Sequence, residues 1–370
     1  MRKRSKITLV QLLWIILAVL AMLLFRVMQR DRDFMNAAVE RFAMPVGKAL
    51  ASISYRVPWS VMELLIALAV MGSFALLLWT GLRWYRTPHR RRELLLRSGL
   101  WVLAAVLTVM AAADWLWGAA YYADGLQEKS GIYAEKISLE ELTLVTRYAA
   151  ANLNEAASEV PRDENGYFAV SREEILAQAD TVYETIAQEI PCLAYADRAP
   201  KPVRFSKVMS HLRLTGVYFS YTGEANVNMD CPPCLLPATV AHEMAHQRFI
   251  ASEKECNFAA VLAATTAESP AYRYSGWLFA YIHLGNALYA ADKDAWQEIR
   301  DSLPQEVKLD LAENNAYWKP YRENGISEGY QNLYDGYLKN YGESAGVKSY
   351  GMVVDLLTVY YRDAAREGLS

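Results

Sequence analysis

Two histidines four residues apart, with a glutamate directly after the first, are the clearest indication of chemistry in this sequence: His242-Glu243-Met244-Ala245-His246. In a helix, residues four apart lie on one face, so His242 and His246 could both offer an imidazole nitrogen to one metal ion. In H-E-x-x-H enzymes the glutamate does not bind the metal but takes a proton from the water that the metal activates. We therefore predict a zinc hydrolase site with Glu243 as general base.

The local sequence favours a helix that carries this motif and then ends soon after it. Pro237 suits a first helical turn, and no helix breaker follows it before the motif. On one straight helix Glu253 would lie ~10 Å along the axis from His246, too far to share an ion. The helix is therefore expected to end near 249–252, where a second helix begins.

A catalytic zinc needs a third protein ligand, and the acids of the second helix are the candidates. Ser252 is a suitable N-cap, and Glu255 stands where a capping box would use its carboxylate. That interpretation leaves Glu253 as the preferred ligand, with Glu255 and Cys256 as alternatives. Asn257, four residues after Glu253, is expected to support a ligating histidine through its second ring nitrogen.

The first third of the chain is apolar enough to cross a membrane. Hydrophobic residues make up 53% of the 370 residues, and three long apolar runs cover about 7–25, 59–82 and 99–120. A cleaved signal peptide is the alternative for the first run, but Arg26 follows it without a small-x-small cleavage site. We expect an uncleaved multi-pass anchor in the lipid bilayer of the cell membrane.

The distribution of basic residues predicts the orientation of this anchor. Lysines and arginines crowd the N-terminus and the stretch 83–97, whereas acids dilute them between the first two runs. Basic segments stay in the cytoplasm, so the N-terminus is predicted to be cytoplasmic and the chain after Tyr121 extracytoplasmic.

The remaining chain has the size of one domain. We predict a membrane anchor over 1–120 and a zincin-like metallopeptidase domain over 121–370, in a mainly helical α+β fold. Helical periodicity is visible over 139–153 and 172–190. The net charge of -3 gives no sign of a nucleic-acid partner.

Residues 216–228 alternate strand-forming residues around Gly223, which predicts a strand or hairpin. Its exposed edge could pair with an extended peptide substrate, although an ordinary packed hairpin has the same pattern. Candidate substrate-binding residues are Tyr221, Gly223, Glu224, Asn226, Arg273 and Tyr274. Candidate donors to a reaction oxyanion are Tyr272, Arg273, Tyr274 and His283, each also explained by packing.

All four cysteines, Cys192, Cys231, Cys234 and Cys256, fall after the apolar runs. In an oxidising exterior an even count is compatible with disulfides, and three pairings are possible. The C-x-x-C spacing at 231–234 is also found in redox proteins, but the surrounding pattern favours a structural bridge or free thiols.

The chain resembles a family of bacterial membrane-anchored proteins known only as a domain of unknown function with zincin-like metallopeptidase character. The resemblance covers Trp117-Gly118, 219–228, 242–248, 253–257, 273–276 and 346–351. Phe249 stands where the family usually has glycine, and Cys256 where it usually has alanine. The resemblance implies the fold and zinc binding, but no substrate.

Two functions follow from these features. The first is a membrane-bound zinc peptidase that cleaves peptide or protein substrates. The alternative is a non-catalytic metal-binding or sensory membrane protein with a structural zinc. Three protein ligands with an open position would favour the first, and a closed set including Cys256 the second.

Overall fold

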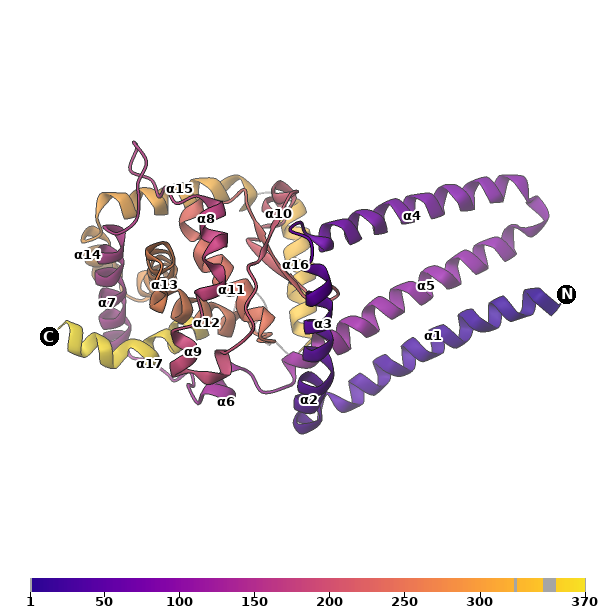
Figure 1. Ribbon diagram of the computed structural model, residues 1–370, viewed down its shortest axis with the longest axis horizontal. Helices are drawn as coiled ribbons and strands as arrows, with labels where there is room; N and C mark the ends of the chain where they lie inside the picture. Colours follow the sequence, from indigo (N-terminus) through magenta and orange to yellow (C-terminus); the bar gives the residue numbers. More distant parts are fainter. Residues whose placement is uncertain (1, 323–324, 342–350, 370) are drawn as a thin grey trace. The chain divides into compact units, whose positions relative to one another are not determined.

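The structure, a computed structural model, describes residues 2–322, 325–341 and 351–369 (Figure 1). The chain is mainly helical with a small three-stranded sheet, as predicted. It forms two compact units, Met1–Ala123 with Phe219–Glu224, and Asp124–Tyr218 with Ala225–Ser370.

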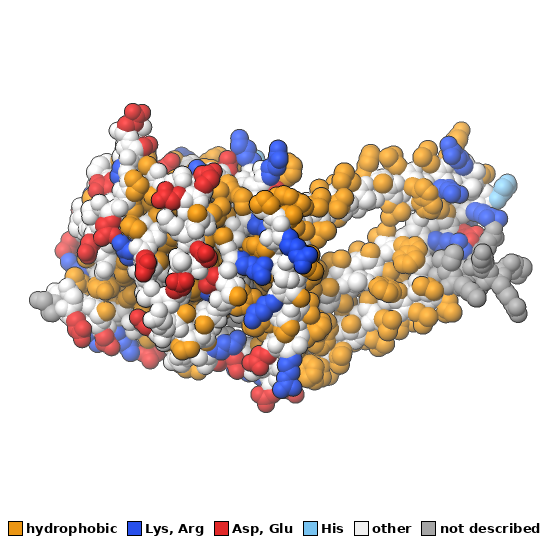
Figure 2. Space-filling model, in the orientation of Figure 1, with side chains coloured by type: hydrophobic (Ala, Val, Ile, Leu, Met, Phe, Trp, Pro, Cys, Tyr) orange, Lys and Arg blue, Asp and Glu red, His pale blue; other side chains and the backbone are white. Residues whose placement is uncertain are grey.

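Three long helices dominate the first unit: α1 (Arg2–Met28), α4 (Val61–Arg86) and α5 (Arg91–Leu116). Each contains an apolar stretch long enough to cross a membrane, in line with the three predicted spans. Most of their large apolar side chains are exposed, and Figure 2 shows them covering the long helices. In water such surfaces would be unfavourable, so these helices suit contact with a lipid bilayer.

The connections between these helices are more ordered than the sequence indicated. The predicted basic loop over 83–97 is largely helical, because α4 continues to Arg86, α5 begins at Arg91, and only residues around η2 (Pro88–Arg90) separate them. The third helix ends at Leu116, before the predicted 120. Between α1 and α4 lie α2 (Arg32–Ala38), a π-helical turn η1 (Val39–Ala43) and α3 (Met44–Ser54).

The second unit is built around α12 (Glu253–Thr266), which is buried on nearly all sides. It packs against α11 (Leu236–Gln247), α13 (Pro270–Ala291) and α17 (Gly351–Gly368). Small side chains allow this, since a Cβ added at Gly276 of α13 would lie 2.8 Å from the Ala264 Cβ of α12. α7 (Leu139–Ala157) packs along α13 and confirms the helix predicted from residue 139.

Shorter elements complete this unit. The helix predicted over 172–190 is wrong as a single element, because it breaks after α8 (Arg172–Ala177). Thr181 Oγ1 donates to the Gln178 carbonyl there, an alternative to continuing the helix.

The remaining elements are short or peripheral. They are η3 (Gly118–Tyr121) of the first unit, and α6 (Leu126–Ser130), η4 (Ala179–Thr181), α9 (Ile186–Glu189), η5 (Pro191–Leu193), α10 (Ser206–Leu212), η6 (Pro233–Leu235), α14 (Lys293–Asp301), α15 (Gln305–Arg322) and α16 (Gly325–Asn340) of the second.

The sheet contains β1 (Lys201–Val203), β2 (Gly216–Phe219) and β3 (Glu224–Asn228) in the order β1-β3-β2. β1 and β3 are parallel, with Lys201 opposite Asn226. β3 is central and fully buried, whereas β2 is partly buried. The predicted hairpin is present, and its turn uses Gly223 at φ +66°, a conformation that favours glycine.

Candidate metal centre

Helix α11 presents both histidines of the H-E-x-x-H motif on one face. Pro237 lies in its first turn, and the Ala238 N–H is satisfied by the Ser275 hydroxyl of α13 at 3.0 Å. His242 and His246 stand one turn apart with ring centroids 4.9 Å from each other. The helix ends at Gln247, immediately after the second histidine.

The chain then turns sharply and starts the next helix at Glu253. Phe249 adopts a left-handed backbone conformation, with φ +61°. This conformation costs a non-glycine residue roughly 1–2 kcal/mol. Its side chain is only 3% exposed, so burial of the ring offsets part of that cost. The turn therefore forms with phenylalanine at the position where the resemblance led us to expect glycine.

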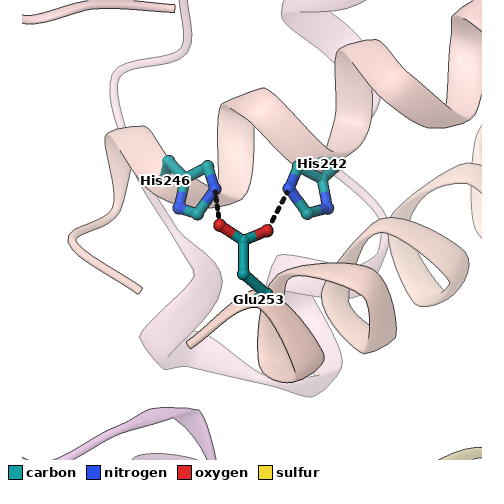
Figure 3. Close-up of side chains that lie close together, drawn as sticks. All are labelled: His242, His246 and Glu253. Carbon is teal, nitrogen blue, oxygen red and sulfur yellow. Dashed lines mark ion pairs between the residues drawn. The ribbon is translucent and has the colours of Figure 1, made fainter. Parts of the chain in front are cut away.

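This turn places the Glu253 carboxylate against both imidazoles (Figure 3). Its Oε2 lies 3.2 Å from His242 Nε2, and its Oε1 lies 3.8 Å from His246 Nε2. Tetrahedral zinc with bonds of about 2.0–2.2 Å separates its ligand atoms by roughly 3.3–3.6 Å. The ligand atoms of the three residues all lie within 4.8 Å of one another. Two nitrogens and one oxygen at this spacing could hold a metal ion, and we refer to His242, His246 and Glu253 as the metal group.

The other ring nitrogen of each histidine has its own partner. His242 Nδ1 lies 2.8 Å from Asn257 Oδ1, and His246 Nδ1 lies 2.9 Å from the Ile250 carbonyl. A carbonyl oxygen can only accept, so His246 carries its proton on Nδ1. The amide oxygen of Asn257 favours the same tautomer for His242. Both Nε2 lone pairs are then directed to the Glu253 side, as metal binding requires.

Cys256 lies behind this group. Its sulfur is 3.2 Å from His246 Nδ1 and 3.2 Å from the Ile250 carbonyl. It therefore contacts the ring nitrogen opposite to the one that faces Glu253. The four cysteines are free thiols, and Cys234 and Cys256 are buried.

The predicted capping role of Glu255 is wrong. Ser252 makes no side-chain cap to α12. Instead, the Glu255 carboxylate accepts hydrogen bonds from the Leu126 and Gln127 backbone N–H groups at 2.7 and 3.2 Å. These donors belong to the first turn of α6, where a carboxylate also interacts favourably with the helix dipole. Glu255 thus caps another helix, held there by tertiary packing that a local motif cannot reveal.

Glu243 is buried beside the histidines, with 3% of its surface exposed. Its Oε2 has no hydrogen-bond partner among the described residues. Gly216, at the start of β2, packs directly on it, since a Cβ there would lie 2.3 Å from Glu243 Oε1. Burial raises the pKa of Glu243 to about 8, an effect that His242 opposes and the Glu253 charge reinforces.

Burial and the charge of Glu253 shift the pKa values of the two histidines in opposite directions. Burial lowers the pKa of His246 to about 4, although the charge of Glu253 opposes it. Burial disfavours the protonated form of His242, but the hydrogen bond that the protonated ring would donate to Glu253, together with the charges of Glu253 and Glu243, outweighs burial and raises the pKa of His242. For Glu253, the bond from His242, the two imidazoles and the Tyr334 bond overcome the effect of burial and lower the pKa to about 2. The site thus holds an ionised carboxylate, as a metal ligand must be.

The candidate substrate-binding residues occupy several different environments. Tyr221 donates to the Val109 carbonyl at 2.9 Å, and Glu224 accepts from the Val61 and Met62 N–H groups at the start of α4. Gly223 packs on Gly47. The contacts of these three residues therefore all lie within the first unit. Asn226 is fully buried in the central strand.

The candidates on α13 also have partners of their own. Arg273 pairs with Glu159, and the Tyr274 hydroxyl donates to the buried Asp310. Tyr272 donates to the Ile175 carbonyl at 2.8 Å. His283 differs: burial, and then repulsion from His242, lower its pKa to about 4.

One contact of the site has no signal in the sequence. The Tyr334 hydroxyl of α16 donates to Glu253 Oε1 at 2.6 Å. Tyr334 follows the motif by more than eighty residues, in a helix rich in tyrosine, so spacing alone could not single it out.

The sequence matches the family described as "Protein of unknown function (DUF3810)" over residues 40–358, most of its length. The chain belongs to this family. No curated protein matches the chain, and no solved structure does. The DUF3810 match agrees with the predicted resemblance to a domain of unknown function, and it names no activity. One segment of that resemblance, 346–350, lies outside the described residues.

Proposed function

We propose that this chain is a membrane-bound zinc-dependent peptidase that hydrolyses peptide bonds outside the cytoplasm. The observation that carries the proposal is the His242, His246 and Glu253 group with the buried Glu243 beside it. A zinc ion held there would polarise a water molecule and the substrate carbonyl.

Glu243 is the proposed general base. Its carboxylate would take a proton from the attacking water and deliver it to the nitrogen of the leaving amine. A divalent cation nearby would lower its pKa from the value of about 8 that burial produces, toward the ionised form that a base needs.

An extended substrate would pair with the edge strand β2. In the order β1-β3-β2, this strand lies at the edge of the sheet formed by the described residues. Gly216 brings its first residue against the Glu243 carboxyl group. Backbone pairing along 216–218 would therefore hold a peptide close to the general base. Arg273 is a further proposed substrate contact, and it also pairs with Glu159.

A structural zinc is the alternative, and the position of Cys256 argues against it. A closed site would need a fourth ligand beside the two Nε2 atoms, whereas the Cys256 sulfur lies against His246 Nδ1. Three protein ligands leave a position for water, which suits hydrolysis.

The test is cleavage of a peptide library by the full chain in detergent. Glu243→Gln keeps the shape of the side chain and all three ligands, so zinc should stay bound while turnover falls by roughly 10² or more. Glu164→Gln, in an exposed loop, is the matched control and should cleave normally. Undiminished cleavage by Glu243→Gln would contradict the proposed mechanism.

A further inference from the structure

Helix α16 reaches the metal group through one side chain. Tyr334 donates its hydroxyl proton to Glu253 Oε1 at 2.6 Å. Tyr330, one turn earlier, stacks on Tyr334 with ring planes 9° apart and centroids 6.0 Å apart. The Tyr334 phenol is thus supported by a neighbouring ring on its own helix.

Other contacts fix the position of helix α16 within the second unit. The Gln331 side chain donates to the Leu212 carbonyl at the end of α10, at 3.2 Å. Leu338 and Tyr341 are 1% and 4% exposed, so the end of this segment is packed into the unit. A phenol attached to such a helix has little freedom to leave the carboxylate it contacts.

The two oxygens of Glu253 have different surroundings. Oε1 accepts the Tyr334 bond and lies 3.8 Å from His246 Nε2. Oε2 lies 3.2 Å from His242 Nε2, closer to the spacing of roughly 3.3–3.6 Å between ligand atoms of tetrahedral zinc. An oxygen that accepts a short hydrogen bond has less electron density to offer a metal.

We propose that Tyr334 is a positioning residue that holds Glu253 as a ligand through Oε2 alone. This inference rests on the metal site of the proposed function. If Oε1 were released, the carboxylate could bind the metal with both oxygens and occupy the position left for water. Tyr334 would thereby keep a coordination position open.

The test compares Tyr334→Phe with Tyr330→Phe in the full chain in detergent. Each change removes one hydroxyl from the same stacked pair, but of the two described hydroxyls it is that of Tyr334 that donates to Glu253. Zinc affinity is measured by competition with a chromogenic chelator, and coordination by the visible absorption of the cobalt-substituted protein. Thermal unfolding of the metal-free variants shows whether both fold.

We expect Tyr334→Phe to weaken zinc binding by roughly 10- to 100-fold, as losing a ligand's supporting hydrogen bond usually does. Its cobalt absorption should weaken, as it does when coordination number rises above four. Tyr330→Phe should match the wild type. Equal affinity and an equal cobalt spectrum in Tyr334→Phe and wild type would overturn the inference. So would a wild type that binds no cobalt, whereas a wild type that binds metal but cleaves no peptide would contradict only the peptidase function.

Discussion

At the scale of single residues, the two acids at the start of α12 have different roles because they contact different groups. Glu253 faces the two imidazoles, whereas Glu255 is 5% exposed and accepts hydrogen bonds from the first turn of α6. Gly125, the residue before that turn, lies so close that an added Cβ would be 2.6 Å from Glu255 Oε2. Only glycine leaves room there for the carboxylate.

We therefore expect Glu255→Gln to destabilise the fold without removing metal. The amide can accept through its oxygen, but its NH₂ group cannot accept from the second backbone N–H, and leaving a buried donor unsatisfied costs about 1–3 kcal/mol. Glu253→Gln should instead weaken zinc binding. Thermal unfolding and zinc content, measured on both variants, test these two predictions. Zinc loss in Glu255→Gln with retention in Glu253→Gln would reverse the assignment.

Residue patterns predicted that His242, His246 and Glu253 come together, because their arrangement depends on local spacing. His242 and His246 follow from the helical repeat, and Glu253 follows from the distance that a straight helix would impose. Tyr334 and the α6 partner of Glu255 could not be predicted, because both contacts join segments far apart in the sequence. Phe249 shows another limit, since a buried aromatic ring supports a turn for which glycine is the usual choice.

At the scale of elements, the edge strand β2 shapes the position of Glu243, the proposed general base. Its first residue, Gly216, has no room for a side chain, because an added Cβ would lie 2.3–2.6 Å from three atoms of the Glu243 side chain. The backbone of β2 at Gly216 therefore packs directly against the Glu243 side chain of α11.

Gly216→Ala should displace the Glu243 carboxyl group. We expect turnover of a cleaved peptide to fall by about 10-fold or more, because small displacements of a positioned base have large effects on rate. Zinc content should stay near the wild-type value. Gly351→Ala is the control, because a Cβ there meets nothing within 4 Å. Wild-type turnover in Gly216→Ala would show that this contact does not position Glu243.

Elements with a strong local signal were predicted well. The three apolar helices, the hairpin and the helix from residue 139 all follow from hydrophobic periodicity and turn residues. The segment 172–190 has helical spacing, yet the Thr181 hydroxyl bonds a backbone carbonyl and the helix ends after Ala177. Strand β1 pairs with a partner more than twenty residues away, which no local pattern indicates.

At the scale of the whole molecule, orientation in the membrane decides which substrates the site could meet. The link between α4 and α5 is short and basic, with Arg83 and Arg86 ending α4 and Arg91 starting α5. Basic residues next to spans favour the cytoplasmic side.

A reporter fused after Ser370 should therefore behave as exported, and one inserted near Pro88 as cytoplasmic. A pair of reporters that work only in opposite compartments, such as a phosphatase and a fluorescent protein, checks both positions. The reverse pattern would place the metal group in the cytoplasm and contradict a peptidase that acts outside it.

We propose that His242, His246 and Glu253 together hold one metal ion. Elemental analysis of the purified full chain tests it most directly, with His242→Ala, His246→Ala and the exposed-site control His211→Ala measured alongside. We predict about one zinc per chain in the wild type and in His211→Ala, and its loss in the other two variants, because each removes one of three ligands. Stoichiometric zinc in both His242→Ala and His246→Ala would contradict this account.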